Sequence, residues 1–281
     1  MAYRGVDLIL CPYHVGKQDQ GVGNGPRAIL DAGIREVIES HGISFSTTTI
    51  DPVNDFEGEI GRSFELLRRI AAAVKAARAS RSFPIVLAGN CNSSVGVFAG
   101  LTAGAVPHGE LGIIWHDAHD DYHNPDTLES GYFDAMGVSM LTGESWKGLT
   151  SSIPGFQPMR KDRVVFCGVR DVSDSYAKAL QSILGQLEAP RRAIVHWDLD
   201  SLDSGSCGKA NRFAASGGLT GDDLQGIAAM LPKTIIPEAL TLASFDPSCS
   251  ERGGAVIAGI SVKSISKLLQ VMAEEGQLLR T

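Results

Sequence analysis

Short apolar runs alternate along this chain with segments whose apolar residues recur at helical spacing. Seven of the runs are apolar on both faces, as in the strands of a parallel sheet that helices cover on both sides. These runs are residues 7–11, 46–50, 84–88, 112–115, 163–167, 193–197 and 239–245. The alternation predicts an α/β fold with a doubly wound, mostly parallel sheet flanked by helices.

Five apolar stripes of helical spacing lie between or after these runs. The first includes Leu30, Ile34 and Ile38, and we expect a single helix there, with Pro26 in its first turn and Gly42 as the stop. The other stripes begin at Leu67, Tyr176, Leu224 and Val262. Since no repeat, low-complexity linker or compositional break divides the chain, we expect residues 1–281 to form one domain.

Polar residues follow the run 112–115 directly, in the sequence DAHDD at 117–121. Side chains alternate in an extended segment, so Asp117, His119 and Asp121 share one side. Ligands in open parallel sheets gather at the carboxyl ends of the strands, where these oxygen and nitrogen donors would suit a hard or borderline cation. The competing interpretation is a polar loop whose acids cap helices.

A second acidic pair, Asp198 and Asp200, follows the run 193–197 and shares a face by the same alternation. Taken alone, the pair fits helix capping equally well. Carboxylates brought together at one sheet edge would repel each other or protonate unless a cation lies between them. The two acidic clusters together offer too many ligands for one zinc and suit two cations about 3.5–4 Å apart with a bridging water.

A third cluster, AGNCNSS at 88–94, follows the run 84–88. It is either a glycine turn with an Asn or Ser cap or a loop that delivers Cys91 to the same edge. The five cysteines are scattered, odd in number and without a CxxC pair, so they form neither a disulfide framework nor a zinc knuckle. We expect the other four to pack as small buried hydrophobes.

The order of these clusters resembles the ureohydrolase family, which includes arginase, agmatinase and formiminoglutamase. That family shows GGDHS, then DAHxD, then DxD followed by LDP, where this chain has AGNCN, DAHDD and DLDSLD. The resemblance extends over nearly the whole chain. It includes the glycine-rich segment 21–26, GVRD at 168–171 and GGLT at 217–220.

The resemblance implies a ligand set for two manganese ions per chain. One ion would take Cys91 and Asp121, the other His119 and Asp200, and both would share Asp117 and Asp198. It also implies that a bridging hydroxide attacks the central carbon of a guanidino-type group, with Asp121 and Asp134 as catalytic residues. The alternative for Cys91 is an idle thiol beside one loosely held metal.

Four positions depart from the family pattern. Cys91 replaces the first metal-binding His, and Asp134 aligns with the proton-shuttling His of arginase. Ser244 replaces a Glu that grips the guanidinium, and Ser173 replaces an Asp that binds the α-amino group, a role that Asp174 could take over. A buried guanidinium that lost its counter-charge would be destabilised by a few kcal/mol.

These departures favour a less basic guanidino group that is cleaved without a strong acid. A ureohydrolase with Cys at the first ligand position resembles the Nω-hydroxy-L-arginine hydrolases of D-cycloserine biosynthesis, which release hydroxyurea and L-ornithine. His123, Asn124 and Ser130 lie where the family binds the amino-acid end of its substrate. The alternatives are another ureohydrolase, acting on arginine, agmatine, a guanidino acid or formiminoglutamate, and a catalytically silent relative that regulates an active one.

The resemblance implies a small guanidino amino acid as the partner, and bulk properties exclude other classes of partner. A formal charge of −7 and a pI near 5.5 argue against nucleic acid and anionic membranes. We expect no run long enough to span a bilayer. Because the first residues lack the apolar core and cleavage site of a signal peptide, we expect a cytoplasmic protein. The sequence does not indicate an oligomeric state.

Overall fold

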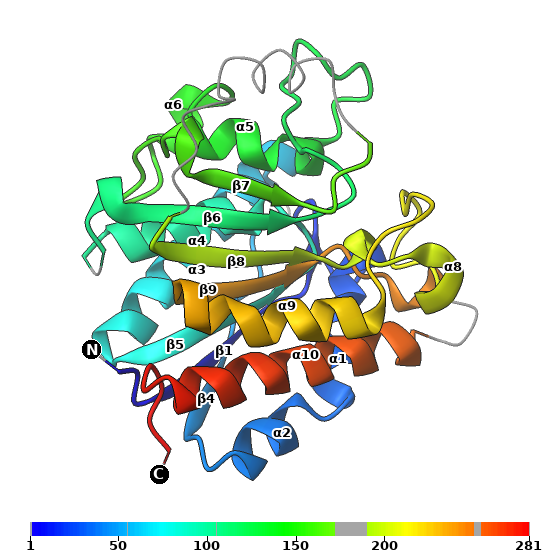
Figure 1. Cartoon of the computed structure of the whole chain (residues 1–281). Coiled ribbons are helices and arrows are strands. Elements are labelled where there is room, and N and C mark those ends of the chain that lie inside the picture. The colour runs from blue at the N-terminus through cyan, green and yellow to red at the C-terminus, as the bar shows by residue number, and fades with distance from the viewer. Residues whose placement is uncertain (1, 55, 105, 172–189, 250–253, 281) are drawn as a thin grey trace.

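A computed structural model describes residues 2–54, 56–104, 106–171, 190–249 and 254–280. Its centre is a sheet of seven parallel strands in the order β4-β1-β5-β9-β8-β6-β7 (Figure 1). The strands are β1 Gly5–Cys11, β4 Phe45–Thr49, β5 Ser82–Ala88, β6 Leu111–His116, β7 Val164–Cys167, β8 Arg192–Asp198 and β9 Ile236–Ala243. Each of the seven predicted runs forms one of these strands, so the predicted fold class is confirmed.

The edge strand β4 corrects one part of that prediction. It was expected to be apolar on both faces, but four of its five residues are exposed and only Phe45 is half-buried. An edge strand has one neighbour and needs no second covered face, and its Ser and Thr residues suit that position. A small antiparallel pair, β2 Tyr13–His14 and β3 Lys17–Gln18, was not predicted.

Helices cover both faces of the sheet, and each face has its own buried apolar cluster. The helices α3 Glu59–Ala79 and α4 Ser93–Thr102 pack on one face. Figure 1 shows α9 Gly221–Thr234 and α10 Ala255–Glu274 side by side on the other face. The helices α1 Gly25–Asp31 and α2 Ile34–Ser40 also cover this face. The shorter helices are α5 Gly137–Leu141, α6 Lys147–Thr150 and α8 Ser204–Cys207.

The first apolar stripe forms two helices instead of the single predicted helix. The helix α1 covers Gly25–Asp31 and α2 covers Ile34–Ser40. Between them Gly33 has φ of 97°, a left-handed conformation that stops one helix before the next begins. The apolar periodicity predicted Gly42 as the stop and did not indicate Gly33. The stripe that begins at Tyr176 lies outside the described residues.

The helix α10 corrects the expectation that no run could span a bilayer. By length and composition alone its 20 residues would suffice. However, Ile257, Ile265, Leu269 and Met272 are completely buried in the cluster shared with α9 and the sheet. This burial is what a core helix of a globular fold requires.

The sheet places four polar loops at one edge. The neighbouring strands β5, β9, β8 and β6 are parallel, so their carboxyl ends lie together (Figure 1). Residues 89–92, 244–246, 198–200 and 117–121 follow or complete these strands. All three polar clusters singled out in the sequence therefore come to the same place, with the loop after β9 as a fourth contributor.

Candidate metal centre

Asp117, His119 and Asp200 form a compact group of donors at the ends of β6 and β8. The Nδ1 atom of His119 lies 3.3 Å from Asp117 Oδ1 and 3.3 Å from Asp200 Oδ2. One ligand atom from each residue lies within 4.8 Å of the others. Oxygen and nitrogen donors at such separations can converge on one divalent cation.

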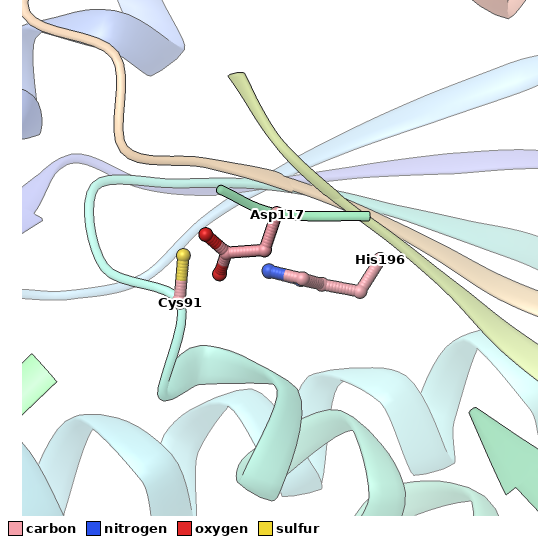
Figure 2. A group of neighbouring side chains, drawn as sticks. All are labelled: Cys91, Asp117 and His196. Atoms are coloured by element: carbon pink, nitrogen blue, oxygen red, sulfur yellow. The ribbon is translucent and has the colours of Figure 1, made fainter. Parts of the chain in front are cut away.

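Cys91 reaches the same centre from the loop between β5 and α4. Its Sγ donates to Asp198 Oδ2 over 2.8 Å and lies 3.1 Å from Ser244 Oγ. The side chain is buried, and its ligand atom groups with those of Asp117 and His196 (Figure 2). The prediction that this loop delivers Cys91 to the acidic edge is confirmed, whereas ligation by Cys91 stays a prediction.

Asp121 lies in the loop after β6, where its backbone adopts φ of 45°. Its carbonyl oxygen accepts hydrogen bonds from the N–H groups of Val138 and Ser139, which ties the loop to α5. Burial raises the pKa of its carboxyl well above the usual range, and the charges of Asp117 and Asp134 raise it further. These carboxylates are therefore close enough to interact strongly.

Local N–H groups orient the clustered carboxylates. The indole Nε1 of Trp115 donates to Asp117 Oδ2 over 2.8 Å, and the backbone N–H of His119 donates to Asp117 Oδ1 over 2.7 Å. The backbone N–H of Asp200 donates likewise to Asp198 Oδ1 over 2.7 Å. The strand-end turns thus hold the carboxylates while leaving other oxygen lone pairs for a ligand.

The donor set fits divalent cations for an electrostatic reason. Burial raises the pKa of Asp117 to about 7, with the charge of Asp200 adding to the effect. Burial and the same neighbouring charge raise the pKa of Asp198 well above its usual range. Burial also acts against ionisation of Asp200, but hydrogen bonds and the charge of His119 outweigh it and lower its pKa to about 2. Bound cations would stabilise all of these groups as carboxylates.

Asp134 lies beside these groups without an arginine or lysine partner among the described residues. It accepts hydrogen bonds from Asn90 Nδ2 over 2.6 Å and from the backbone N–H of Asn92 over 3.0 Å. Burial raises the pKa of Asp134 to about 6 despite these bonds. The sequence alone did not indicate a raised pKa, which makes this carboxyl a better acid near neutral pH.

Ser244 follows β9, and its neutral hydroxyl does not supply the negative charge of the Glu that the family pattern has at this position. Its hydroxyl faces Cys91, and its backbone is held at φ of 60°, with its carbonyl accepting from Asn211 Nδ2 over 3.0 Å. The same Nδ2 donates to Asp200 Oδ2 over 3.0 Å. Asn211 thus links the loop after β9 to a candidate ligand.

Four of the candidate ligands, His119, Asp121, Asp198 and Asp200, line a cavity of about 1090 Å³. The predicted substrate residues His123 and Ser130 also line it. Asn124 does not, because its Oδ1 accepts from the backbone N–H groups of Asp126 and Thr127 and closes a turn. Asp174 lies outside the described residues.

Sequence reasoning missed three residues at this centre: His196, Asn211 and Arg212. His196 could have been found, because it precedes Asp198 by two positions and strand alternation places both on one face. Asn211 and Arg212 lie in a loop without regular periodicity that follows the short helix α8. Nothing in the local sequence connects that loop to the cavity.

A model of the Arginase family matches residues 4–203. The chain belongs to this family. Its relatives include the arginase of Glaciozyma antarctica, 26% identical over 291 residues that cover 87% of this chain and 81% of that protein. The arginase of Eremothecium gossypii is 28% identical over 192 residues, covering 63% of this chain and 47% of that protein. That of Bacillus caldovelox is 29% identical over 187 residues, covering 63% and 61%. The match thus spans less than two thirds of the latter two arginases.

Solved structures agree with this membership of the arginase family at the level of the fold. Bacillus subtilis arginase has a TM-score of 0.80 at 22% identity, covering 94% of this chain and 98% of that one. Entamoeba histolytica arginase in complex with L-ornithine has a TM-score of 0.82 at 17% identity, covering 95% and 99%. Bacillus subtilis formimidoylglutamase has a TM-score of 0.67 at 14% identity, and the match covers 98% of this chain and 89% of that one. The predicted family is therefore confirmed, whereas the member within it is not.

For this arginase-family chain, we expect the purified protein to contain about two manganese ions per chain. The variant Asp198→Ala should lose most of the metal at both positions. The change removes a carboxylate that accepts hydrogen bonds from Cys91 and from the backbone N–H of Asp200, one residue from each donor group. Elemental analysis of the purified proteins measures the content. Asp203→Ala is the matched control, since Asp203 caps the short helix α8. Equal metal content in the two variants would show that Asp198 holds no ion.

Proposed function

We propose that this chain is a binuclear metal-dependent hydrolase that cleaves a guanidino-type C–N bond. The substrate best suited to the site is Nω-hydroxy-L-arginine, with hydroxyurea and L-ornithine as products. The observation that carries the reaction class is the convergence of Cys91 with Asp117, His119, Asp198 and Asp200 at one sheet edge. His119, Asp198 and Asp200 of this group line the large cavity, which is open to a small molecule.

The proposed ligands divide between two manganese ions. Cys91 and Asp121 would hold one, His119 and Asp200 the other, and Asp117 and Asp198 would bind both. When bound, the ions supply Lewis acidity and lower the pKa of a water molecule so that it becomes a nucleophile at neutral pH. The aspartates and the N–H groups that orient them keep the donors in place between turnovers.

Asp134 is the proposed proton donor to the departing amine. It lines the cavity, and its hydrogen bonds from Asn90 and Asn92 fix the carboxyl group there. Burial raises its pKa to about 6, so a larger fraction of Asp134 holds a proton at neutral pH than for an exposed Asp. A carboxyl with a raised pKa would thus take the place of the family's imidazole as the proton donor.

The charges around the cavity favour a substrate with a cationic or polarisable head and one anionic end. Eight carboxylates line it: Glu59, Asp120, Asp121, Asp134, Asp171, Asp198, Asp200 and Asp246. Among its described lining residues Arg212 is the only arginine or lysine. It directly follows Asn211, which contacts Asp200. Arg212 and the candidate ligand Asp200 therefore line the same cavity.

Arg212 is suited to bind the substrate α-carboxylate. Its guanidinium lies 4.6 Å from the ring centre of Phe213 and 5.9 Å from that of Tyr132. Such contacts use the faces of the aromatic rings, and an arginine held in this way binds a carboxylate through its N–H groups. Agmatine lacks that carboxylate, so Arg212 favours an amino acid over an amine.

The uncharged side of the pocket favours a hydroxylated guanidino group. Ser244 offers no charge to a guanidinium, and its hydroxyl already faces the thiol of Cys91. Arginine would enter without a counter-charge at that position, which is costly for a desolvated cation. The electron-withdrawing hydroxyl of Nω-hydroxy-L-arginine lowers the basicity of its guanidino group, so the neutral form binds at less cost.

We expect hydroxyurea release from Nω-hydroxy-L-arginine to exceed urea release from L-arginine by at least about a hundredfold in kcat/KM. That ratio corresponds to roughly 2.7 kcal/mol of transition-state discrimination. A manganese-reconstituted assay of both products measures it, and Ser244→Glu with Asp134→His should shift preference toward arginine. Similar rates on both substrates would leave a general guanidino hydrolase. No hydrolysis of any guanidino compound by metal-loaded protein would instead indicate a silent relative.

Replacing the proposed carboxylate anchor separates amino-acid from amine substrates. Arg212→Ala should raise KM for hydroxyarginine by about tenfold or more, because a charged hydrogen bond contributes roughly 1.5–3 kcal/mol. Activity on agmatine, if present, should change little. Steady-state kinetics on both compounds test this, with Arg160→Ala as a control since Arg160 is exposed and lies outside the cavity lining. An equal loss on both substrates would contradict a carboxylate-binding role.

A further inference from the structure

His196 is a completely buried imidazole at the inner wall of the metal centre. It lies in β8 two positions before Asp198, on the face that the strand turns toward Cys91. Figure 2 shows a ring nitrogen of His196 directed toward the carboxylate of Asp117, with the sulfur of Cys91 on the far side of that carboxylate. One ligand atom from each of the three residues lies within 4.8 Å of the others.

The hydrogen bonds of the ring leave one nitrogen for another ligand. Nδ1 of His196 lies 3.0 Å from Ser94 Oγ. Nε2 is buried and has no hydrogen-bond partner within the part of the chain that the structure describes. Metal-bound histidines commonly donate their second N–H to a nearby oxygen, which fixes the tautomer with a lone pair on the metal side. Ser94 is placed to be that oxygen.

One indole group holds two of the three donors in position. The ring of Trp115 stacks on His196, with centroids 3.8 Å apart and planes 26° from parallel. The same indole donates from Nε1 to Asp117 Oδ2 over 2.8 Å. His196 and Asp117 are therefore oriented by a common neighbour, as expected for a preorganised ligand set.

A neutral nitrogen donor adds a ligand without adding to the negative charge that Cys91 brings. A Cys91 thiolate with four aspartates brings about −5 to two divalent ions that carry +4. An imidazole adds a donor without adding charge. It also makes the donor set near Cys91 one of sulfur, nitrogen and oxygen, which borderline cations accept better than manganese does.

We propose that His196 is a metal ligand at the Cys91 position of the binuclear centre. With Cys91 and Asp117 it would favour a borderline divalent cation such as Zn²⁺, Fe²⁺ or Co²⁺ there over the manganese of the proposed function. In this arrangement β8 supplies an imidazole ligand, whereas the family pattern has its first metal-binding His at the position of Cys91, in the loop after β5. This inference rests on the metal dependence in the proposed function and not on the identity of the substrate. In the competing view His196 is a structural imidazole held by Ser94 and Trp115.

The test compares cobalt binding in His196→Gln and His116→Gln. His116 is an equally buried imidazole, its Nδ1 lies 3.1 Å from the carbonyl oxygen of His196, and it belongs to neither donor group. Competition with a chelator gives the affinity of each protein for Co²⁺ without substrate. We expect His196→Gln to bind its first Co²⁺ at least about tenfold more weakly than His116→Gln, and to alter the cobalt absorption spectrum. A difference smaller than about tenfold, or an unchanged spectrum, would overturn the proposal.

A second measurement on the wild-type protein stands even if His196→Gln does not fold. X-ray absorption of protein loaded with one equivalent of Zn²⁺ should show one sulfur at about 2.3 Å together with imidazole nitrogen at about 2.0–2.1 Å. Sulfur without imidazole, or imidazole without sulfur, would refute the ligand set. Neither measurement involves turnover, so a protein that binds metal but does not hydrolyse Nω-hydroxy-L-arginine would leave this inference intact. A protein that binds no metal would contradict both this inference and the proposed function.

Discussion

The repulsion among buried carboxylates is the constraint on which the rest of this site depends. Asp117, Asp121, Asp198 and Asp200 lie almost completely out of water at one edge of the sheet. Burial and mutual charge raise the pKa of three of them, while the hydrogen bond and charge of His119, together with a hydrogen bond from Asn211, lower the pKa of Asp200. Such a cluster is costly without cations and strongly favourable with them. The surrounding N–H donors, the Cys91 thiol and the His196 ring all lie against these carboxylates, and the negative charge of the cluster determines what each of them can do.

The parallel sheet explains how so many polar groups reach one point. Four adjacent strands end at the same edge, and each is rigidly held by neighbours on both sides. Their buried inner residues contribute the hydrophobic stabilisation that offsets the cost of the acidic edge. The loop after β5 must pass close to the chain at Tyr13, where a Cβ on Gly89 would lie 2.1 Å from a backbone oxygen. Only glycine fits there, and this approach is what carries Cys91 to the carboxylates.

Periodicity and strand-end clusters were sufficient to predict the fold class and most candidate ligands. The DAHDD and DLD segments follow buried strands, and alternation in extended chain fixes which side chains share a side. The split of the first helix at Gly33 was missed, because a single glycine within a good apolar stripe does not reveal its left-handed backbone. The local sequence also gave no sign that the Ser244 hydroxyl would face Cys91.

The substrate end of the cavity was harder to predict for a physical reason. Arg212 and Asn211 reach it through an irregular loop, and their contacts with Tyr132 and Ser244 depend on packing between segments far apart in the sequence. His196 was missed for another reason, since a histidine within an apolar strand resembles a core residue whose ring nitrogens are both hydrogen-bonded. Its unpartnered nitrogen is visible only once β6, β8 and the Cys91 loop are placed together.

Anomalous diffraction from crystals of the metal-loaded protein tests the central claim most directly. The account predicts two peaks about 3.5–4 Å apart between β6 and β8. One should lie within bonding distance of Cys91 Sγ, at about 2.3 Å, and the other beside His119 and Asp200. A single peak away from Cys91, or none at the acidic edge, would contradict it.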